Sequence, residues 1–419
     1  MFKNLKQIFH PKSKDIRKRI LFTIGALFIF CLGSSIPIPG TNVIEKDLGF
    51  LELMNLMGGG SLKNFSIFAL GVSPYISASI ITSILQMDVF PYFSELRNQG
   101  KVGQQKLNKI TRYMGIALAF IQGFAMASLF MSSSTNASAL EYLRIATIMT
   151  AGTSFLLWLG DQITTKGLGN GISLIIMAGI ISTLPSMFVT TYTSLVVDAS
   201  SLFIGIISFV IFIIIYLAII IGIIYVQESE RRIPIQHASK TTSAYGKQQS
   251  YIPFKLNSAG VMPVIFASIF LSFPSFIAGF VNNEGFTNFV NKYLSYSTPV
   301  GFVVYIVLIF VFGYFYTFLQ LKIEDISKNL KNQGSYIPGI RPGKETITYL
   351  KSVVSRITLI GTIFLAIIAA IPIIFAQISS LPTSVSIGGT GILIVVGVAL
   401  ETYRQLESSL VNRTYKGVR

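Results

Sequence analysis

The sequence is poor in the side chains from which most catalytic and metal-binding sites are built. Its 419 residues include one cysteine and two histidines. Cys31 has no second cysteine to pair with, and His10 and His237 are too far apart in sequence to form a metal-binding motif. We therefore expect no disulfide framework, no metal site, no cofactor and no catalytic residue, and the redox compartment stays undetermined.

Charged residues are also scarce: they make up 12% of the chain, whereas soluble proteins contain about 25%. Hydrophobic residues reach 52%, so lipid is the expected solvent for most of the chain. The net charge of +16 comes from basic residues in short stretches between apolar runs, which favours membrane orientation and cytosolic partners over nucleic acid. The first apolar run lacks a small-residue cleavage site and is predicted to be a retained span.

What the chain has in abundance is long apolar runs. A helix needs about 20 mostly apolar residues to cross a bilayer, and ten runs meet this requirement. The expected fold class is therefore an all-α integral membrane protein with ten transmembrane helices. The predicted spans are residues 20–38, 72–89, 114–133, 143–160, 170–190, 202–226, 258–280, 299–321, 357–377 and 389–405.

The distribution of lysine and arginine sets the predicted orientation. Ten spans place both termini on one side of the membrane. If that side is the cytoplasm, 29 of the 33 basic residues lie in cytosolic segments, while the acidic residues divide 11 to six. Because the positive-inside rule depends on lysine and arginine, we expect both termini to be cytoplasmic.

No predicted span contains a charged residue away from its ends. Ion-coupled transporters usually keep a charged side chain at membrane depth, because the coupling ion must be bound there. The nearest phrase to a nucleotide-binding loop, residues 339–345, is one residue short of the required spacing and lacks its serine or threonine. These absences disfavour a coupled transporter and indicate that any energy comes from a partner or from the membrane potential.

One apolar segment is too short to span the membrane. Residues 50–57 (FLELMNLM) are followed by three glycines, 58–60. Irregular backbone at membrane depth needs surrounding protein or a water-filled cavity, which predicts a re-entrant element. Spacing alone leaves an interfacial amphipathic helix equally open.

Two long predicted cytosolic loops, residues 227–256 and 322–356, combine basic residues with proline and glycine. This composition predicts ordered turns and not helices. Their arginines either satisfy the positive-inside rule and contact lipid headgroups or dock a partner, and the Pro/Gly-framed arginines favour docking. At the N-terminus, residues 2–9 place apolar side chains on one helical face and predict an amphipathic segment on the inner leaflet.

Specific phrases spread along the chain resemble the SecY family of membrane channels. They are FSIFALGVSPYISASI (65–80), WLGDQIT (158–164), GNGIS (169–173), PGIRPG (338–343) and GGT (388–390). The resemblance implies a clamshell of two pseudo-symmetric five-helix halves, residues 20–195 and 196–405, with an N-terminal cytosolic segment 1–19 and a cytosolic tail 406–419.

The function implied by this resemblance is a passive protein-conducting channel in the plasma membrane, for secretion and for lateral insertion. The implied partners are the SecE and SecG subunits, the SecA motor ATPase, the ribosome, signal sequences and unfolded preproteins, and membrane lipids, with no small-molecule substrate. Two alternatives stay open: an accessory SecY for specialised substrates, and a substrate-specific membrane transporter.

The resemblance also assigns roles to residues. The pore ring falls on Val72, Ile76, Ile176, Ile265 and Ile394. The plug, about residues 51–64, includes Leu51, Leu53, Met54, Leu56, Met57, Gly58, Gly59 and Gly60. The lateral gate includes Ser77, Ser83 and Asn257, and motor or ribosome docking falls on Arg231, Arg232, Arg341 and Lys344.

The chain departs from the family pattern at four positions. Ser83 stands where the family usually has a glutamine that faces Asn257, which predicts a weaker polar clasp across the gate. Cys31, Gln104 and Gln105 stand where the family often has arginine, so a lipid or partner contact that depends on those charges is in doubt.

Overall fold

The computed structural model describes residues 14–41, 51–86, 90–131, 139–197, 201–237, 250–281, 284–294, 298–379 and 383–416. The amphipathic segment predicted at 2–9 lies outside them. The helices of the N-terminal half are α2 Lys14–Ser34, α3 Glu52–Met57, α4 Ser73–Leu85, α5 Pro91–Asn98, α6 Gly100–Met131, α7 Ala139–Lys166, α8 Gly171–Tyr192 and the π-helical turn η3 Thr193–Val197. The C-terminal half contains α9 Leu202–Glu228, β1 Glu230–His237, β2 Ser250–Lys255, α10 Met262–Val281, α11 Glu284–Tyr293, α12 Pro299–Gln320, α13 Ile323–Asn332, β3 Ser335–Tyr336, α14 Lys344–Ile378 and α15 Thr383–Lys416.

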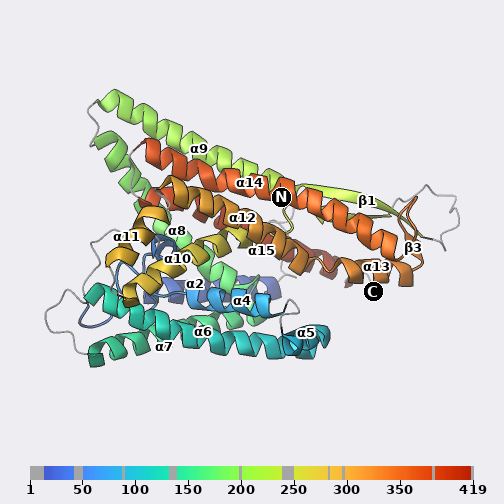
Figure 1. The fold of residues 1–419 in the computed structure, drawn as a ribbon, viewed down its shortest axis with the longest axis horizontal. Helices are drawn as coiled ribbons and strands as arrows, with labels where there is room; N and C mark the ends of the chain where they lie inside the picture. The colour runs from blue at the N-terminus through green and yellow to red at the C-terminus, as the bar shows by residue number, and fades with distance from the viewer. Residues whose placement is uncertain are drawn as a thin grey trace.

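The long helices run roughly parallel to the longest axis of the molecule (Figure 1). In that view α4, α6 and α7 lie on one side and α9, α12 and α14 on the other, with α8 and α10 between them. β1, β3, α13 and α5 gather at one end, whereas α11 lies at the opposite end. The arrangement is a bundle with small polar elements at one mouth.

Each of the ten predicted spans overlaps a helix of the structure: α2, α4, α6, α7, α8, α9, α10, α12, α14 and α15. Within the described residues, six helices are long and apolar enough to cross a membrane by length and composition, and α4 and residues 262–274 of α10 form shorter apolar helices. The most apolar, α9, exposes a large share of its isoleucine, leucine and valine side chains. Such a surface is stable in lipid and costly in water.

The prediction of turns in place of helices in the two cytosolic loops is wrong for the second loop. Residues 323–332 form α13, and α14 begins at Lys344, well before the predicted span at 357. α13 is amphipathic and buries Ile323 and Leu330 on one face. Hydropathy marks only the lipid-facing part of a helix, so a helix that continues into water is missed by a span count.

The two loops fold together as one small unit. β1 pairs antiparallel with both β2 and β3, so the sheet order is β2-β1-β3 and strands from both loops share it. Tyr336 Oη donates to Gln236 Oε1 at 3.0 Å across the β1–β3 pair. A separate apolar core lies beneath the sheet and is formed by Ile233, Phe254, Ile323, Ile337, Leu350, Val354 and Ile357.

Candidate functional site

The five residues predicted for the pore ring lie in one cluster of buried apolar side chains. They come from four helices: Val72 is the N-cap of α4 and Ile76 lies in its first turn, and α8, α10 and α15 each contribute one isoleucine. All five are buried, with exposed fractions between 1% and 7%. Aliphatic side chains from helices far apart in sequence therefore belong to one continuous buried apolar cluster.

The short helix α3 packs directly on this cluster. It contacts α8 and α15, and its Leu56 and Met57 side chains belong to the same buried cluster as the five ring residues. The approach is closest at Gly179 of α8, where an added Cβ would lie 2.2 Å from the Met57 carbonyl oxygen. Only glycine at this position lets the backbone of α3 reach α8. The segment is thus enclosed by protein and is not an interfacial helix on the outside of the bundle.

The rest of the segment is held by its own hydrogen bonds. Asn55 Nδ2 donates to Glu52 Oε1 at 3.2 Å, and Asn55 Oδ1 accepts from the Lys63 backbone N at 3.0 Å. Gly59 and Gly60 have φ values of 73° and 79°, which favour glycine and let the chain reverse after α3. Leu51 and Met54 are buried in a second apolar cluster on the other side of α3, and Gly58 is buried as well. Leu53 lies on α3, but its side chain is outside the described part.

The chain that leads from α3 to α4 is fixed to α7. Thr153 Oγ1 donates to the Gly71 carbonyl at 3.2 Å, and a Cβ added at Gly152 would lie 2.1 Å from the Ile67 carbonyl oxygen. Ser61 Oγ donates to the Phe68 carbonyl at 2.9 Å and closes the loop on itself. The segment between α3 and Val72 is therefore held in place by its contacts with α7 and by its own hydrogen bond.

The predicted gate residues lie on α4 and just before α10. Ser77 is buried on α4, Ser83 is partly buried near its end, and Asn257 is buried in the turn that leads to α10. Asn257 Nδ2 donates to the Gly260 carbonyl at 2.9 Å. Among the described residues no hydrogen bond joins Ser83 to Asn257.

A seam with four polar side chains among apolar ones lies between α4, α6 and α10, and sequence reasoning missed it. A small void of about 10 Å³ is lined by Met54 and Met57 of α3, Ser73 and Ser77 of α4, Gln122 of α6, and Ile269, Ser272 and Phe273 of α10. Gln122 is buried, and its Oε1 has no hydrogen-bond partner in the described part of the chain. An unsatisfied buried amide lowers the cost of separating the helices around it. The available sequence signal was a polar residue inside an apolar span.

A large polar cavity opens at the mouth where β1 and α5 lie. Its volume is about 700 Å³, and a neighbouring cavity of about 330 Å³ shares Asn170, Glu401, Gln405 and Ser409 with it. Burial lowers the pKa of Lys255, which lines the larger cavity, and the charge of Arg404 lowers it further. Charged and amide side chains thus line the mouth, in contrast to the apolar cluster deeper in the bundle.

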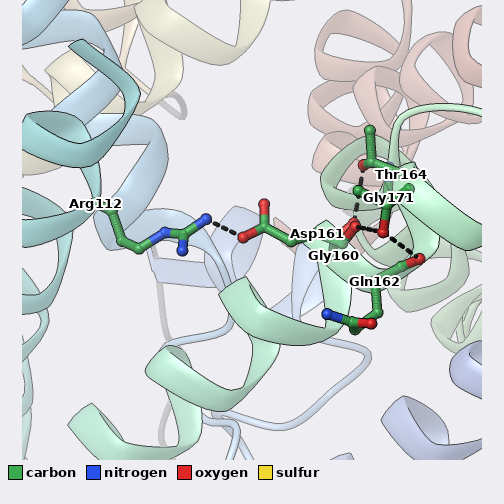
Figure 2. Close-up of polar contacts among 7 residues, drawn as sticks. Arg112, Gly160, Asp161, Gln162, Thr164 and Gly171 are labelled. Atoms are coloured by element: carbon green, nitrogen blue, oxygen red, sulfur yellow. Dashed lines mark hydrogen bonds and ion pairs between the residues drawn. The ribbon is translucent and has the colours of Figure 1, made fainter. Parts of the chain in front are cut away.

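A brace at this mouth sets the start of α8, the helix that carries Ile176 and Gly179. Arg112 of α6 donates to Asp161 Oδ2 of α7 (Figure 2). Thr164 Oγ1 donates to the Gly160 carbonyl and accepts from the Gly171 backbone N, both at 2.9 Å. Two of the phrases that carried the family resemblance, WLGDQIT and GNGIS, meet at this point.

The predicted docking residues are exposed on the loop unit. Arg231 and Arg232 lie on β1, and Arg232 Nε donates to Glu230 Oε1 at 2.7 Å, which raises its pKa. Arg341 precedes α14, and its backbone is held on both sides: its N donates to Glu345 Oε2 at 3.4 Å, and its carbonyl accepts from Thr346 Oγ1 at 2.9 Å. Lys344 is the first residue of α14. The turn presents the Arg341 side chain to solvent on a fixed backbone.

Comparison with known proteins shows which solved structures and which family this chain is similar to. The fold is similar to the solved structure of a protein-conducting channel, with a TM-score of 0.68 at 18% identity over 94% of this chain and 92% of that one. It is also similar to Sec61 in the canine ribosome–channel complex from the endoplasmic reticulum, with a TM-score of 0.65 at 17% identity over 94% and 92% of the two chains. The SecY family model matches residues 66–403.

The chain belongs to the SecY family. It is 46% identical to the protein translocase subunit SecY of Bacillus licheniformis, over 100% of this chain and 99% of that protein. The same identity holds for the subunit from Bacillus subtilis, with the same coverage. The SecY membership predicted from the quoted phrases, and the helical membrane channel fold that goes with it, are confirmed.

Proposed function

We propose that this protein is the central pore-forming subunit of a Sec translocase, a passive channel that conducts unfolded protein. The observation that carries the proposal is a buried apolar cluster, containing the five predicted ring residues from four helices, against which a short helix followed by glycines is packed. A cavity of about 700 Å³ opens in the bundle next to residues 255–262, which connect the loop unit to α10. Both features support a channel whose apolar neck is closed when idle.

The apolar neck is suited to a cargo of any sequence. Aliphatic side chains that meet in a constriction exclude water and ions. They make no fixed hydrogen bonds that a passing polypeptide has to break, so the neck yields to a chain and closes behind it. On this proposal the plug is residues 51–64, which include α3, and the ring is formed by Val72, Ile76, Ile176, Ile265 and Ile394.

The lateral exit of the proposed channel is the seam between α4 and α10. Ser73 and Ser77 of α4 face a small void together with Ser272 of α10 and the incompletely bonded Gln122. Apolar signal sequences and future membrane spans would leave through this seam because lipid favours them. Ser83 and Asn257 mark its cytosolic end.

The partners of the proposed channel follow from its loops and from its family. The loop unit presents Arg231, Arg232, Arg341 and Lys344 to solvent at one mouth. We propose that SecA or a ribosome docks there, that SecE and SecG complete the complex, and that the membrane is the plasma membrane with both termini cytoplasmic. The halves of the clamshell would divide near residue 195.

A stalled precursor tests whether protein passes through the neck. A photo-crosslinking amino acid replaces Ile176 in one variant and Ile181 in another. Ile181 is the matched control because it lies on the same helix and is exposed. Crosslinks to the stalled chain at 176 and not at 181 support the proposal, and an equal yield at the two positions contradicts it.

Replacing Ile176 with glycine is expected to make the idle channel leak ions. The variant opens a gap in the apolar ring, and water fills a gap that aliphatic side chains no longer close. Single-channel conductance in planar bilayers measures the leak. The control is Ile181→Gly, because both variants exchange isoleucine for glycine within α8 and so carry the same helix penalty of about 0.5 kcal/mol. Tight closure of Ile176→Gly would remove this residue from the ring.

A further inference from the structure

The short helix α5 joins the two halves of the molecule at the cytosolic mouth. It follows α4 in the N-terminal half, yet Arg97 Nη2 donates to the carbonyl oxygen of Leu319 in α12 at 3.4 Å. The two residues are 222 positions apart in sequence, and the contact is partly buried. A side chain of one half is therefore bonded to the main chain of the other.

The Leu319 carbonyl is available because it lies in the last turn of α12, which ends at Gln320. The last four carbonyls of a helix have no partner within the helix. The backbone N of Ile323, four residues on, donates instead to the Leu321 carbonyl at 2.9 Å. Arg97 thus supplies a donor to a carbonyl that its own helix leaves open, and a cation at a helix C-terminus is favoured by the helix dipole.

The surroundings of Arg97 leave room for movement. A cavity of about 430 Å³ lies between α5, α12 and α13, and Glu324, Asp325, Lys322 and Lys351 line it together with Arg97, so the charges around the guanidinium group balance. Glu324 is already paired with Lys351 at 3.5 Å. The Leu319 carbonyl is therefore the hydrogen-bond partner of the guanidinium group, beside a gap that is not filled by packed side chains.

The hydrogen bond between Arg97 and Leu319 lies on the side of the molecule where the two halves would separate. α10 packs against α4, α6 and α12, so the proposed seam runs beside the helix that Arg97 contacts. On the side where the chain passes from one half to the other, Tyr216 of α9 contacts the Met187 sulfur of α8 at 3.8 Å. If the two halves separate by pivoting about the connection between α8 and α9, the distance between Arg97 and Leu319 increases, whereas the contact between Tyr216 and Met187 is kept.

We propose that Arg97 is a latch that sets how strong a signal sequence must be to open the lateral seam. This inference rests on the channel function proposed above. The bond must break whenever α5 moves away from the end of α12, so it biases the idle channel toward closure. A weakly apolar signal cannot overcome this bias, whereas a strongly apolar signal can. Arg97 acts as a positioning residue and touches no cargo.

Spin-label distances test the latch without any export assay. One label is placed at Lys166→Cys in the N-terminal half and one at Lys328→Cys in the C-terminal half, in a Cys31→Ser background of the full complex in lipid nanodiscs. Both label sites are exposed. Arg97→Ala is expected to lengthen and broaden the distance distribution of the idle channel. Lys101→Ala removes one exposed charge nearby and should leave the distribution unchanged, and Arg97→Lys should restore part of the closure.

A reconstituted import assay tests the threshold, which is how apolar a signal sequence must be to open the channel. For a precursor with a shortened apolar signal, Arg97→Ala is expected to raise import roughly three- to tenfold, the range for a partly exposed charged hydrogen bond. Import of the intact precursor should change little.

Each outcome of these two measurements decides a separate point. An unchanged distance distribution, or a wider one without a change in threshold, overturns the latch. Failure of the unaltered complex to import the intact precursor would count against the channel function instead, and the distances would still judge the latch. If Arg97→Ala does not assemble, the comparison is made with Arg97→Met, which keeps the aliphatic stem and removes the donor; an unchanged distance distribution together with an unchanged threshold in that variant overturns the proposal.

Discussion

Replacing Gly179 with alanine is expected to unseat the plug and make the idle channel conduct ions. The added Cβ would lie 2.2 Å from the Met57 carbonyl oxygen and 3.0 Å from the Gly59 nitrogen. Non-bonded atoms pack at roughly 3.5 to 4.0 Å, so α3 has to move outward by about 1 Å or more. The loss is not one of helix stability, because alanine in a helix interior is favoured over glycine by about 1 kcal/mol.

Planar-bilayer conductance of the purified complex measures this leak. Gly25→Ala is the matched control, since it lies in α2 and a Cβ there meets nothing within 4 Å. We expect Gly25→Ala to stay closed and Gly179→Ala to open frequently without any motor or precursor. A Gly179→Ala channel as tight as the unaltered one would show that the contact between α3 and α8 does not seal the pore.

Reversing the charge of Arg341 is expected to stop motor-driven export while the complex stays assembled. The backbone of this residue is held by Glu345 and Thr346, so the substitution changes the exposed side chain and not the turn. Placing like charges against each other at an interface costs several kcal/mol, so we expect export to fall roughly tenfold or more. Import into liposomes and co-purification of the complex are measured on the same preparation.

The control for this variant is Lys292→Glu, which makes the same change in net charge on α11, at the opposite end of the molecule from the loop unit (Figure 1). We expect it to import normally. Normal export by Arg341→Glu would contradict the docking role of this turn, and a comparable loss in both variants would attribute the effect to net charge.

The helices could be predicted from the sequence, but several of their ends could not. Apolar runs indicate where lipid surrounds a helix, and each of the ten predicted spans overlaps one. Hydropathy does not indicate a helix where it extends beyond the lipid, as α14 does between Lys344 and residue 357. It is also silent on the pairing of β1 with β3, because two residues of a strand leave no periodic pattern.

Only the side chains of the candidate site could be predicted from the sequence, and its backbone contacts could not. The ring residues were assigned from the resemblance, and their common burial is consistent with it. The contact of Gly179 with α3 depends on a backbone approach that no side-chain pattern records. The bond from Arg97 to Leu319 joins positions 222 residues apart and uses a main-chain acceptor, so the sequence carries no sign of it.

Import into liposomes by the complex of this protein with its candidate SecE partner tests the channel function most directly. A signal-bearing precursor is added with SecA and ATP, and protease then degrades whatever stays outside. We expect protected full-length precursor only when both the motor and ATP are present, because the channel itself is passive. No protected precursor from a complex of verified composition and orientation would contradict the channel function.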